Sequence, residues 1–273
     1  MKHAQSVATP ESPDLLQSAK GGVLEITLNQ PATRNALGLG MIAALQGAVA
    51  QAAGDRRVRA VLISGAGPAF SAGHDLREID AHRADADGGR GYFEDLMASC
   101  SALMGSLQAM PQPVIAAIEG VATAAGCQLV AACDLAIAGA DARFATPGVN
   151  IGLFCSTPLV AVGRAVSRKH AMEMALTGEL YGAAQAERFG LVNRVVPAGQ
   201  ALAEARKLAQ GIAARPAATL ALGKRAFYQQ IERPLAEAYA LASRAMVENL
   251  DLADSREGIG AFLEKRAPKW QVP

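Results

Sequence analysis

The chain has 273 residues, of which 51% are hydrophobic and 19% charged, a balance that excludes a disordered protein and allows a large buried core. Because 26 lysines and arginines stand against 25 aspartates and glutamates, the formal net charge of +1 gives no global attraction to nucleic acid or to an anionic membrane. Aromatic residues make up only 4%, which disfavours surfaces for base stacking.

The sequence contains four cysteines: Cys100, Cys127, Cys133 and Cys155. They form no CxxC pair and have no histidine cluster beside them, so we expect reduced, mostly buried thiols and no metal site. The N-terminal segment MKHAQSVATPESPDLLQ has no apolar signal core and no arginine, from which we expect a cytoplasmic protein. Proline, glycine or amide residues interrupt the long uncharged runs at 35–54, 96–118 and 144–163, so none of them predicts a membrane-spanning helix.

The first half of the chain predicts strands that alternate with helices. Residues 1–20 are polar, contain two prolines and are expected to form a flexible tail. The patterns that follow predict a strand at 23–28, a helix at 39–52, a strand at 58–64, a helix from Asp75 with Glu78 in a capping box, a charged glycine-rich loop at 81–91, and a helix from Phe93.

The second half continues this alternation and then becomes helical. The patterns predict strands at 114–118, 134–138 and 191–196, helices at 124–133, from 157 and at 167–178, and helices from about residue 200 with a break at Pro234 and a last helix from Asp254, capped with Glu257. This order indicates an α/β core at 21–198 followed by a helical region at 199–273.

One glycine-bearing turn imitates a dinucleotide-binding loop but does not meet its requirements. The turn Ser64-Gly65-Ala66-Gly67-Pro68-Ala69-Phe70 follows a predicted strand. Phe70 stands where the third glycine belongs, Pro68 removes a backbone donor, and no acidic residue follows a second strand at the required distance. The sequence therefore does not predict a nicotinamide site.

Three segments carry the chemistry. Residues 60–76 and 113–134 each predict a strand that turns into a helix through small residues, and residues 144–153 form a proline- and glycine-containing loop. Such turns leave backbone N–H groups free at a helix N-terminus, and two of them together would form an oxyanion hole. The alternative is that the small residues only allow a strand and a helix to pack closely.

These segments, together with the C-terminal run at 261–266 (AFLEKR), resemble the crotonase (enoyl-CoA hydratase/isomerase) superfamily from about residue 22 onward. The run at 144–158 is closer to one branch of the superfamily, which includes animal mitochondrial proteins. The resemblance implies an α/β spiral of ββα units with a C-terminal helical trimerisation region. It also implies an acyl-CoA thioester as the small-molecule partner, no cofactor apart from the coenzyme A that the substrate carries, and a homotrimer or a dimer of trimers.

By position, the resemblance assigns the oxyanion-hole donors to the backbone N–H groups of His74 and Ala125. The His74 imidazole is expected to be a partly exposed bystander, with an acid–base role as the alternative. Asp75 is expected to be the N-cap of the next helix. The two glutamates of family hydratases fall on Gln128 and Gly148, so neither catalytic carboxylate is present.

Four other side chains are candidates to replace these two carboxylates. Glu119 stands at a strand end, where we expect a packing or helix-edge role. Glu94 and Asp95 are expected on a solvated helix face, and Cys155 is expected to be a buried, inert thiol.

The resemblance also places residues around the coenzyme A part of the substrate. The expected contacts are Arg34, Ala36, Ala72, Asp75 and Leu76, with Phe262 and Lys265 from the C-terminal region, often of a neighbouring subunit. Lys265 would pair with phosphate as a point charge, and Phe262 has a role in the core as its alternative.

The sequence thus predicts an acyl-CoA-binding enzyme, nominally an enoyl-CoA hydratase or isomerase of fatty acyl-CoA metabolism. The alternatives are a non-catalytic protein that binds acyl-CoA or regulates a partner, and an acyl-CoA thioester hydrolase.

Overall fold

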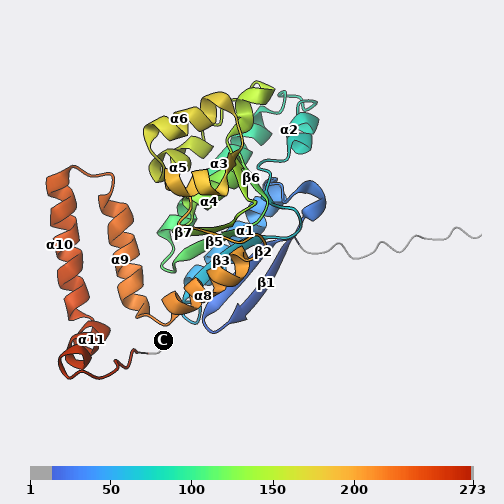
Figure 1. Ribbon diagram of the computed structural model, residues 1–273. Coiled ribbons are helices and arrows are strands. Elements are labelled where there is room, and N and C mark those ends of the chain that lie inside the picture. Colours follow the sequence, from blue (N-terminus) through green and yellow to red (C-terminus); the bar gives the residue numbers. More distant parts are fainter. Residues whose placement is uncertain (1–13, 272–273) are drawn as a thin grey trace, which may run out of the picture.

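A computed structural model describes residues 14–271, which form two β-sheets surrounded by helices (Figure 1). The larger sheet has the strand order β1-β2-β3-β5-β7-β10 and is parallel except for the antiparallel pair β1–β2. Its strands are Leu15–Lys20, Val23–Leu28, Ala60–Gly65, Val114–Ile118, Leu135–Gly139 and Arg194–Val196. The smaller sheet consists of β4 (Ala69–Ser71), β6 (Val121–Thr123), β8 (Arg143–Ala145) and β9 (Tyr181–Gly182).

The chain winds through the two sheets as a spiral. Each turn takes one strand of the larger sheet, one strand of the smaller sheet and then helical structure. The three turns are β3–β4 followed by α2 (Leu76–His82) and α3 (Arg90–Ala109), β5–β6 followed by α4 (Ala125–Ala132), and β7–β8 followed by η2 (Pro147–Ile151) and α5 (Pro158–Ala165). This is the α/β spiral that the resemblance implied.

Further helices complete the chain. They are η1 (Pro31–Thr33), α1 (Leu39–Gly54), α6 (Arg168–Thr177), α7 (Ala183–Phe189), α8 (Ala201–Ala213), α9 (Ala217–Gln230), α10 (Leu235–Asp251) and α11 (Ala253–Leu263). The described residues include no helix that is both long and apolar enough to cross a bilayer.

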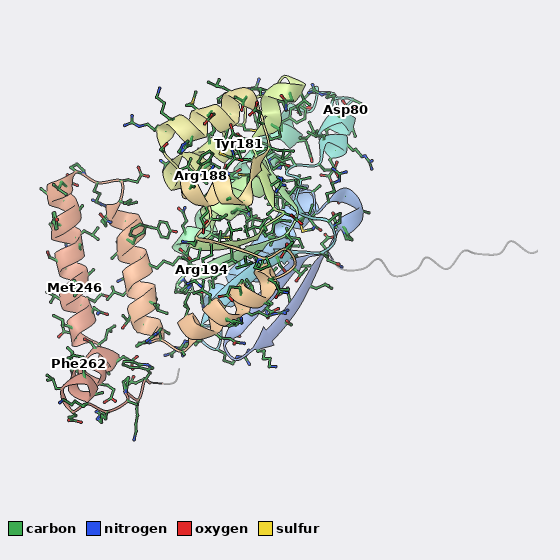
Figure 2. All side chains as sticks on the ribbon, viewed as in Figure 1. Asp80, Tyr181, Arg188, Arg194, Met246 and Phe262 are labelled. Carbon is green, nitrogen blue, oxygen red and sulfur yellow. The ribbon has the colours of Figure 1, made fainter. Side chains whose placement is uncertain are left out.

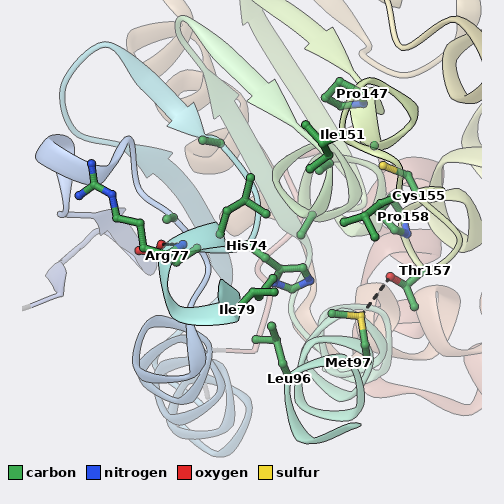
Figure 3. A pocket seen from close by; sticks show the side chains of 18 of the residues that line it. His74, Arg77, Ile79, Leu96, Met97, Pro147, Ile151, Cys155, Thr157 and Pro158 are labelled. Atoms are coloured by element: carbon green, nitrogen blue, oxygen red, sulfur yellow. Dashed lines mark hydrogen bonds between the residues drawn. The ribbon is translucent and has the colours of Figure 1, made fainter. Parts of the chain in front are cut away.

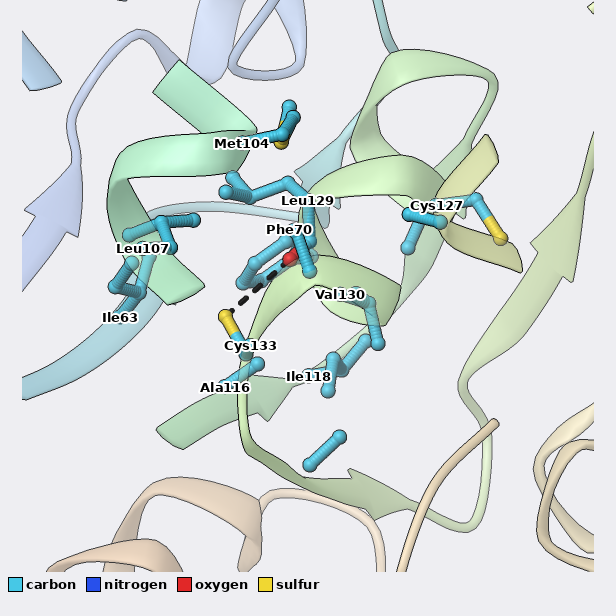
Figure 4. Close-up of a cluster of buried hydrophobic side chains, with 14 of the residues drawn as sticks. Ile63, Phe70, Met104, Leu107, Ala116, Ile118, Cys127, Leu129, Val130 and Cys133 are labelled. Atoms are coloured by element: carbon cyan, nitrogen blue, oxygen red, sulfur yellow. Dashed lines mark hydrogen bonds between the residues drawn. The ribbon is translucent and has the colours of Figure 1, made fainter. Parts of the chain in front are cut away.

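Helices cover both faces of the larger sheet, which is why its central strands are continuous apolar runs. Alternate residues of β3 divide between the faces: Val61 and Ile63 join the main core, whereas Ala60 and Leu62 face α8. Figure 4 shows part of the main core, where Ile63, Phe70 and Leu129 come from β3, β4 and α4. All four cysteines are free and buried, as expected.

The expected N-terminal tail at 1–20 is wrong for its last six residues, because residues 15–20 form β1. Gly21 and Gly22 have φ of 59° and 81°, which suits the tight turn that pairs β1 with β2. β1 is an edge strand in which only Leu15 is buried, so its hydrophobic pattern is weak. The expectation for residues 1–13 lies outside the described part of the chain.

The C-terminal helices begin at Ala201, as the sequence predicts, but the first of them belongs to the core. α8 packs on the larger sheet through a stripe of small residues at every fourth position: Ala201, Ala205, Ala209 and Ala213. Helices α9, α10 and α11 instead extend to one side of the core (Figure 1). The capping box expected at Asp254 is also wrong: α11 starts at Ala253, and Asp254 accepts a hydrogen bond from the backbone N–H of Gln271.

Candidate active site

The turn between β4 and α2 is held in place by the segment that follows β2. Buried Ser71 donates its hydroxyl to the Asn35 carbonyl at 2.8 Å and accepts the Gly73 N–H at 3.2 Å. The Leu37 N–H donates to the Gly73 carbonyl at 2.7 Å. The turn is thereby fixed up to His74, and Asp75 then caps α2 by accepting the Arg77 N–H, as the sequence predicts.

The second turn, between β6 and α4, contains a strained residue. Ala124 has φ 51° and ψ −119°, a conformation that costs a residue with a side chain roughly 1–3 kcal/mol. It is followed by Ala125, the first residue of α4, and by Gly126, which packs against the carbonyl of Ser71. This backbone conformation of Ala124 sets the direction in which α4 begins.

The two turns lie directly against each other. A Cβ atom on Gly73 would stand 2.9 Å from the Thr123 carbonyl oxygen and 3.1 Å from the Ala125 nitrogen, and the Thr123 hydroxyl donates to the Ala72 carbonyl at 3.0 Å. Among the described residues, the backbone N–H groups of His74 and Ala125 have no acceptor. Two neighbouring free donors are suited to bind one carbonyl or oxyanion oxygen.

These turns open onto a cavity of about 880 Å³ (Figure 3). His74, Ala125, Gly148, Arg34, Ala36, Ala72, Asp75 and Leu76, eight of the residues expected in the site, line it. Much of the remaining wall is apolar, from Ile79, Phe93, Leu96, Met97 and Pro158. The cavity therefore joins a polar pair of donors to a hydrophobic compartment.

His74 is partly exposed, as we expected, but its ring is held against the protein rather than free in solvent. Its Nδ1 lies 2.9 Å from the Leu37 carbonyl oxygen, whereas Nε2 is buried without a hydrogen-bond partner among the described residues. Burial lowers the pKa of the imidazole below its ordinary value, although the contact with Leu37 opposes this shift. A buried polar atom without a partner costs about 1–3 kcal/mol, so the unpaired Nε2 destabilises the folded chain.

The two positions of the family's glutamates lie in different surroundings. Gln128 is 3% exposed on α4 and does not line the cavity; its amide oxygen lies 3.9 Å from Cys100 Sγ. Gly148 lines the cavity, but a Cβ there would stand 2.9 Å from the Leu153 carbonyl oxygen and 3.0 Å from Cys155 Sγ. Neither position presents a proton donor to the cavity.

The other acidic candidates have the structural surroundings that we expected. Glu119 accepts the Ala201 N–H at 2.9 Å and so caps α8. Glu94 pairs with Arg90 on the exposed face of α3, and Asp95 is also exposed. Cys155 does line the cavity, but burial raises the pKa of its thiol and favours the protonated form.

Three arginines stand at the cavity: Arg34 after β2, Arg77 on α2 and Arg83 at the end of α2. Arg34 has φ 54° and is followed by buried Asn35, whose amide group donates to the carbonyls of Ala66 and Ala69. Sequence reasoning found Arg34 but missed Arg77 and Arg83. The helix predicted from Asp75 could have indicated both of them. Arg77 lies on this helix and Arg83 at its end, and the helix forms part of the cavity wall.

Phe262 and Lys265 lie away from this cavity within one chain. Both are on or after α11, on the far side of the molecule from α2 (Figures 1 and 2). Phe262 is 82% exposed, so its alternative role in the core is wrong for the single chain. Within residues 14–271, no group of three or more histidine, cysteine or acidic side chains is placed to hold a metal ion.

Comparison with known proteins identifies the class. The chain matches the family "Enoyl-CoA hydratase/isomerase" over residues 18–273 and belongs to it, and its fold is the crotonase fold. An enoyl-CoA hydratase from Mycobacterium smegmatis has a crystal structure with a TM-score of 0.90 and 49% identity, covering 95% of this chain and 99% of that one.

Within the family, the chain is similar to enoyl-CoA hydratase domain-containing protein 3. The mitochondrial rat (Rattus norvegicus) protein is 47% identical over 265 residues, which are 96% of this chain and 87% of that protein. The crystal structure of the human protein has a TM-score of 0.90 and 44% identity, covering 94% of this chain and all of the other. These similarities confirm the family and the branch that the sequence motifs indicate.

The expectation of a cytoplasmic location is corrected by the same comparisons. The relatives from rat, mouse, frog, human and zebrafish are all named mitochondrial proteins, at 44% to 48% identity. The composition of a short N-terminal segment was too weak a basis for a cytoplasmic assignment.

Proposed function

We propose that this crotonase-family protein binds an acyl-CoA thioester and polarises its carbonyl group with the backbone N–H groups of His74 and Ala125. The observation that carries the proposal is the contact of the two turns at Gly73, which brings two donors without acceptors to one end of the cavity. Each such donor is typically worth about 10²–10³ in rate when it binds an enolate oxygen.

The coenzyme A part of the ester lies, in this proposal, near Arg34, Arg77 and Arg83. The positive side chains suit its phosphates, while Ala36 and Leu76 offer small and apolar contacts beside them. The acyl group enters the compartment lined by Phe93, Leu96 and Met97 and fits there by burying apolar surface.

The ordinary hydration with two glutamates is not the reaction that we assign. It needs one carboxylate to activate water and a second to deliver a proton to the α-carbon. Gln128 is an amide that lies outside the cavity wall, and Gly148 has no side chain. A polarised thioester that forms an enolate is the chemistry that the remaining donors support.

We also propose that the chain assembles as a homotrimer or a dimer of trimers. Helices α9, α10 and α11 carry exposed apolar side chains, among them Leu235 and Tyr239. Met246 and Phe262, also exposed, are labelled in Figure 2. In such an assembly, Phe262 and Lys265 of a neighbouring copy would supply the contacts with coenzyme A that one chain lacks.

Two other functions follow from the same polarised carbonyl: binding of acyl-CoA without turnover, alone or to regulate a partner, and hydrolysis of the thioester. A panel of enoyl-CoA and saturated acyl-CoA esters separates them. Hydration removes absorbance of the conjugated double bond, hydrolysis releases a free thiol, and bare binding gives only calorimetric heat. The proposal would be contradicted if the protein bound no acyl-CoA ester more tightly than it binds free coenzyme A.

A further inference from the structure

The His74 imidazole is left without a role when only the backbone of this residue binds the thioester. Its Nδ1 faces the carbonyl oxygen of Leu37 at 2.9 Å, and a carbonyl oxygen only accepts hydrogen bonds. Nδ1 must therefore carry a proton, and in the neutral ring Nε2 must be the atom with the free lone pair. The contact thus fixes one tautomer of the ring.

Nothing among the described residues occupies that lone pair. Nε2 is buried and has no hydrogen-bond partner. Figure 3 shows the ring among Ile79, Leu96 and Met97, which line the same cavity and offer no donor. Burial lowers the pKa of the ring, which keeps it neutral and able to accept a proton at neutral pH.

The other charged or titratable groups around the cavity are less suited to accept a proton. They are Arg34, Asp75, Arg77, Arg83 and Cys155. A guanidinium group has only hydrogen-bond donors and no free lone pair that could accept a proton. Asp75 already accepts the Arg77 N–H as the cap of α2, and burial keeps the Cys155 thiol protonated. His74 is therefore the best-placed neutral base of the described cavity wall.

We propose that His74 Nε2 is the base that removes a proton from the α-carbon of the bound acyl-CoA ester and, as the imidazolium, returns it. The inference rests on the proposed function, because the carbonyl must first be held by the N–H groups of His74 and Ala125. Since the ring and one donor belong to the same residue, a carbonyl oxygen at that donor brings the α-carbon close to the ring.

The proton transfer is balanced without any further reactant. The lone pair of Nε2 forms the new N–H bond as the α-carbon–hydrogen bond breaks. The electron pair of that bond becomes the carbon–carbon double bond of the enolate, and the carbonyl π pair moves to the oxygen between the two backbone donors. Return of the proton to carbon restores the ester and the neutral ring.

The test is exchange of the α-hydrogens of butanoyl-CoA in deuterium oxide, followed by the mass of the recovered ester. We expect deuterium incorporation by the wild type and a loss of about 10²-fold or more in His74→Asn. Asparagine keeps a donor for Leu37 and keeps the backbone N–H, but it lacks Nε2. His82→Gln, on α2 but outside the cavity lining, is the matched control and should exchange like the wild type.

Two readouts distinguish chemistry from a structural role. The wild-type exchange rate should fall at acidic pH with a single ionisation, whose pKa lies below that of a free histidine. Added imidazole should partly restore exchange in His74→Ala. Calorimetry should give a dissociation constant for butanoyl-CoA in His74→Asn within about threefold of the wild type, because the backbone donors remain.

Two results would remove His74 from the role of the base. An ester that binds to the wild type without α-exchange, or exchange that His74→Asn leaves within about threefold of the wild type, removes the assignment but leaves acyl-CoA binding intact. Absence of any butanoyl-CoA binding removes the proposed function itself. Circular dichroism of His74→Asn and His74→Gln checks that each variant folds, so a loss shared by both folded variants supports the assignment.

Discussion

Gly73 and Ala125, which are 52 positions apart in the sequence, are in contact: a Cβ on Gly73 would lie 3.1 Å from the Ala125 backbone nitrogen. Gly73 has φ of +89°, a conformation that glycine adopts without strain. The pair of free donors in the cavity depends on this close approach, because any larger residue at position 73 would push the two turns apart.

Gly73→Ala should therefore impair both ligand binding and stability. We expect acyl-CoA affinity to fall by about tenfold or more and the free energy of unfolding to fall by about 1–3 kcal/mol. Gly88→Ala is the matched control, since Gly88 also has positive φ, +68°, but has no atom within 4 Å of the added Cβ. Calorimetry and thermal unfolding measure the two effects. Equal acyl-CoA affinity in both variants would contradict the proposed role of the contact.

Restoring a glutamate at position 148 should not restore hydration. The added Cβ meets the Leu153 carbonyl oxygen at 2.9 Å, and this backbone atom cannot move without shifting the turn. We expect Gly148→Glu, alone or with Gln128→Glu, to lose about 1–3 kcal/mol of stability and to gain no hydration of crotonyl-CoA. The decay of conjugated absorbance measures the rate, and Gly105→Ala, with open space around its Cβ, is the control for stability. A hydration rate in the double variant well above that of the wild type would show that the turn can adapt.

The sequence predicted the larger sheet well because its central strands are buried on both faces. Runs such as 60–63 and 114–118 are apolar throughout, and runs so short and so continuous are typical of strands buried on both faces. The smaller sheet escaped prediction because its strands have two or three residues, too few to show a period of two. β1 escaped prediction because its single buried side chain, Leu15, leaves no alternation to detect.

The candidate site was predicted in part, and only with the help of the family resemblance. The residues of both turns were found, but their contact depends on a long-range approach between Gly73 and Ala125 that no local pattern encodes. The orientation of the His74 ring was also beyond prediction, because its partner Leu37 lies 37 positions earlier and binds through a backbone oxygen.

Acidification should destabilise the protein partly through His74. Burial lowers the pKa of His74 in the folded state, so between the unfolded pKa near 6.5 and the lower folded pKa the unfolded chain binds more protons. Stability therefore rises with pH across this window and is lost as pH falls from about 6.5. We expect His74→Asn to lose less free energy of unfolding than the wild type between pH 7 and pH 5. Denaturant unfolding at each pH measures this loss of stability. Equal losses in the wild type and in His74→Asn would contradict a lowered pKa of His74 in the folded state.

Lys224 should anchor α9 to the core through a buried ion pair. Its side chain is 7% exposed, and Nζ donates to Asp134 at 2.6 Å and to the carbonyls of Leu107 and Gln112. Lys224→Met leaves the Asp134 carboxylate without its cation and should cost about 3 kcal/mol or more in the free energy of unfolding. Arg225→Met, next to it on α9, breaks only the exposed pair with Glu248 and should cost at most about 1 kcal/mol. Denaturant titration compares the two, and similar losses would argue against an anchoring role.

Assembly should depend on the exposed stripe of α10. Leu235, Tyr239, Met246 and Leu250 recur at spacings of four and seven residues, so they share one face of the helix, and all four are more than half exposed in the single chain. Burying such a face favours association, and a charge placed within it opposes association. We expect the wild type to scatter light as three or six copies of 28.1 kDa at micromolar concentration, and Tyr239→Glu to lower that mass.

The matched control for this test is Arg244→Glu, which places the same charge on α10 away from the stripe and should keep the mass of the wild type. If a neighbouring copy supplies Phe262 and Lys265 to the coenzyme A site, Tyr239→Glu should also bind acyl-CoA more weakly, although none of its cavity residues has changed. Calorimetry with one ester on both variants measures this second effect. A wild type of 28.1 kDa would refute the proposed assembly. A dissociated Tyr239→Glu with undiminished affinity would instead show that one chain holds the whole acyl-CoA site.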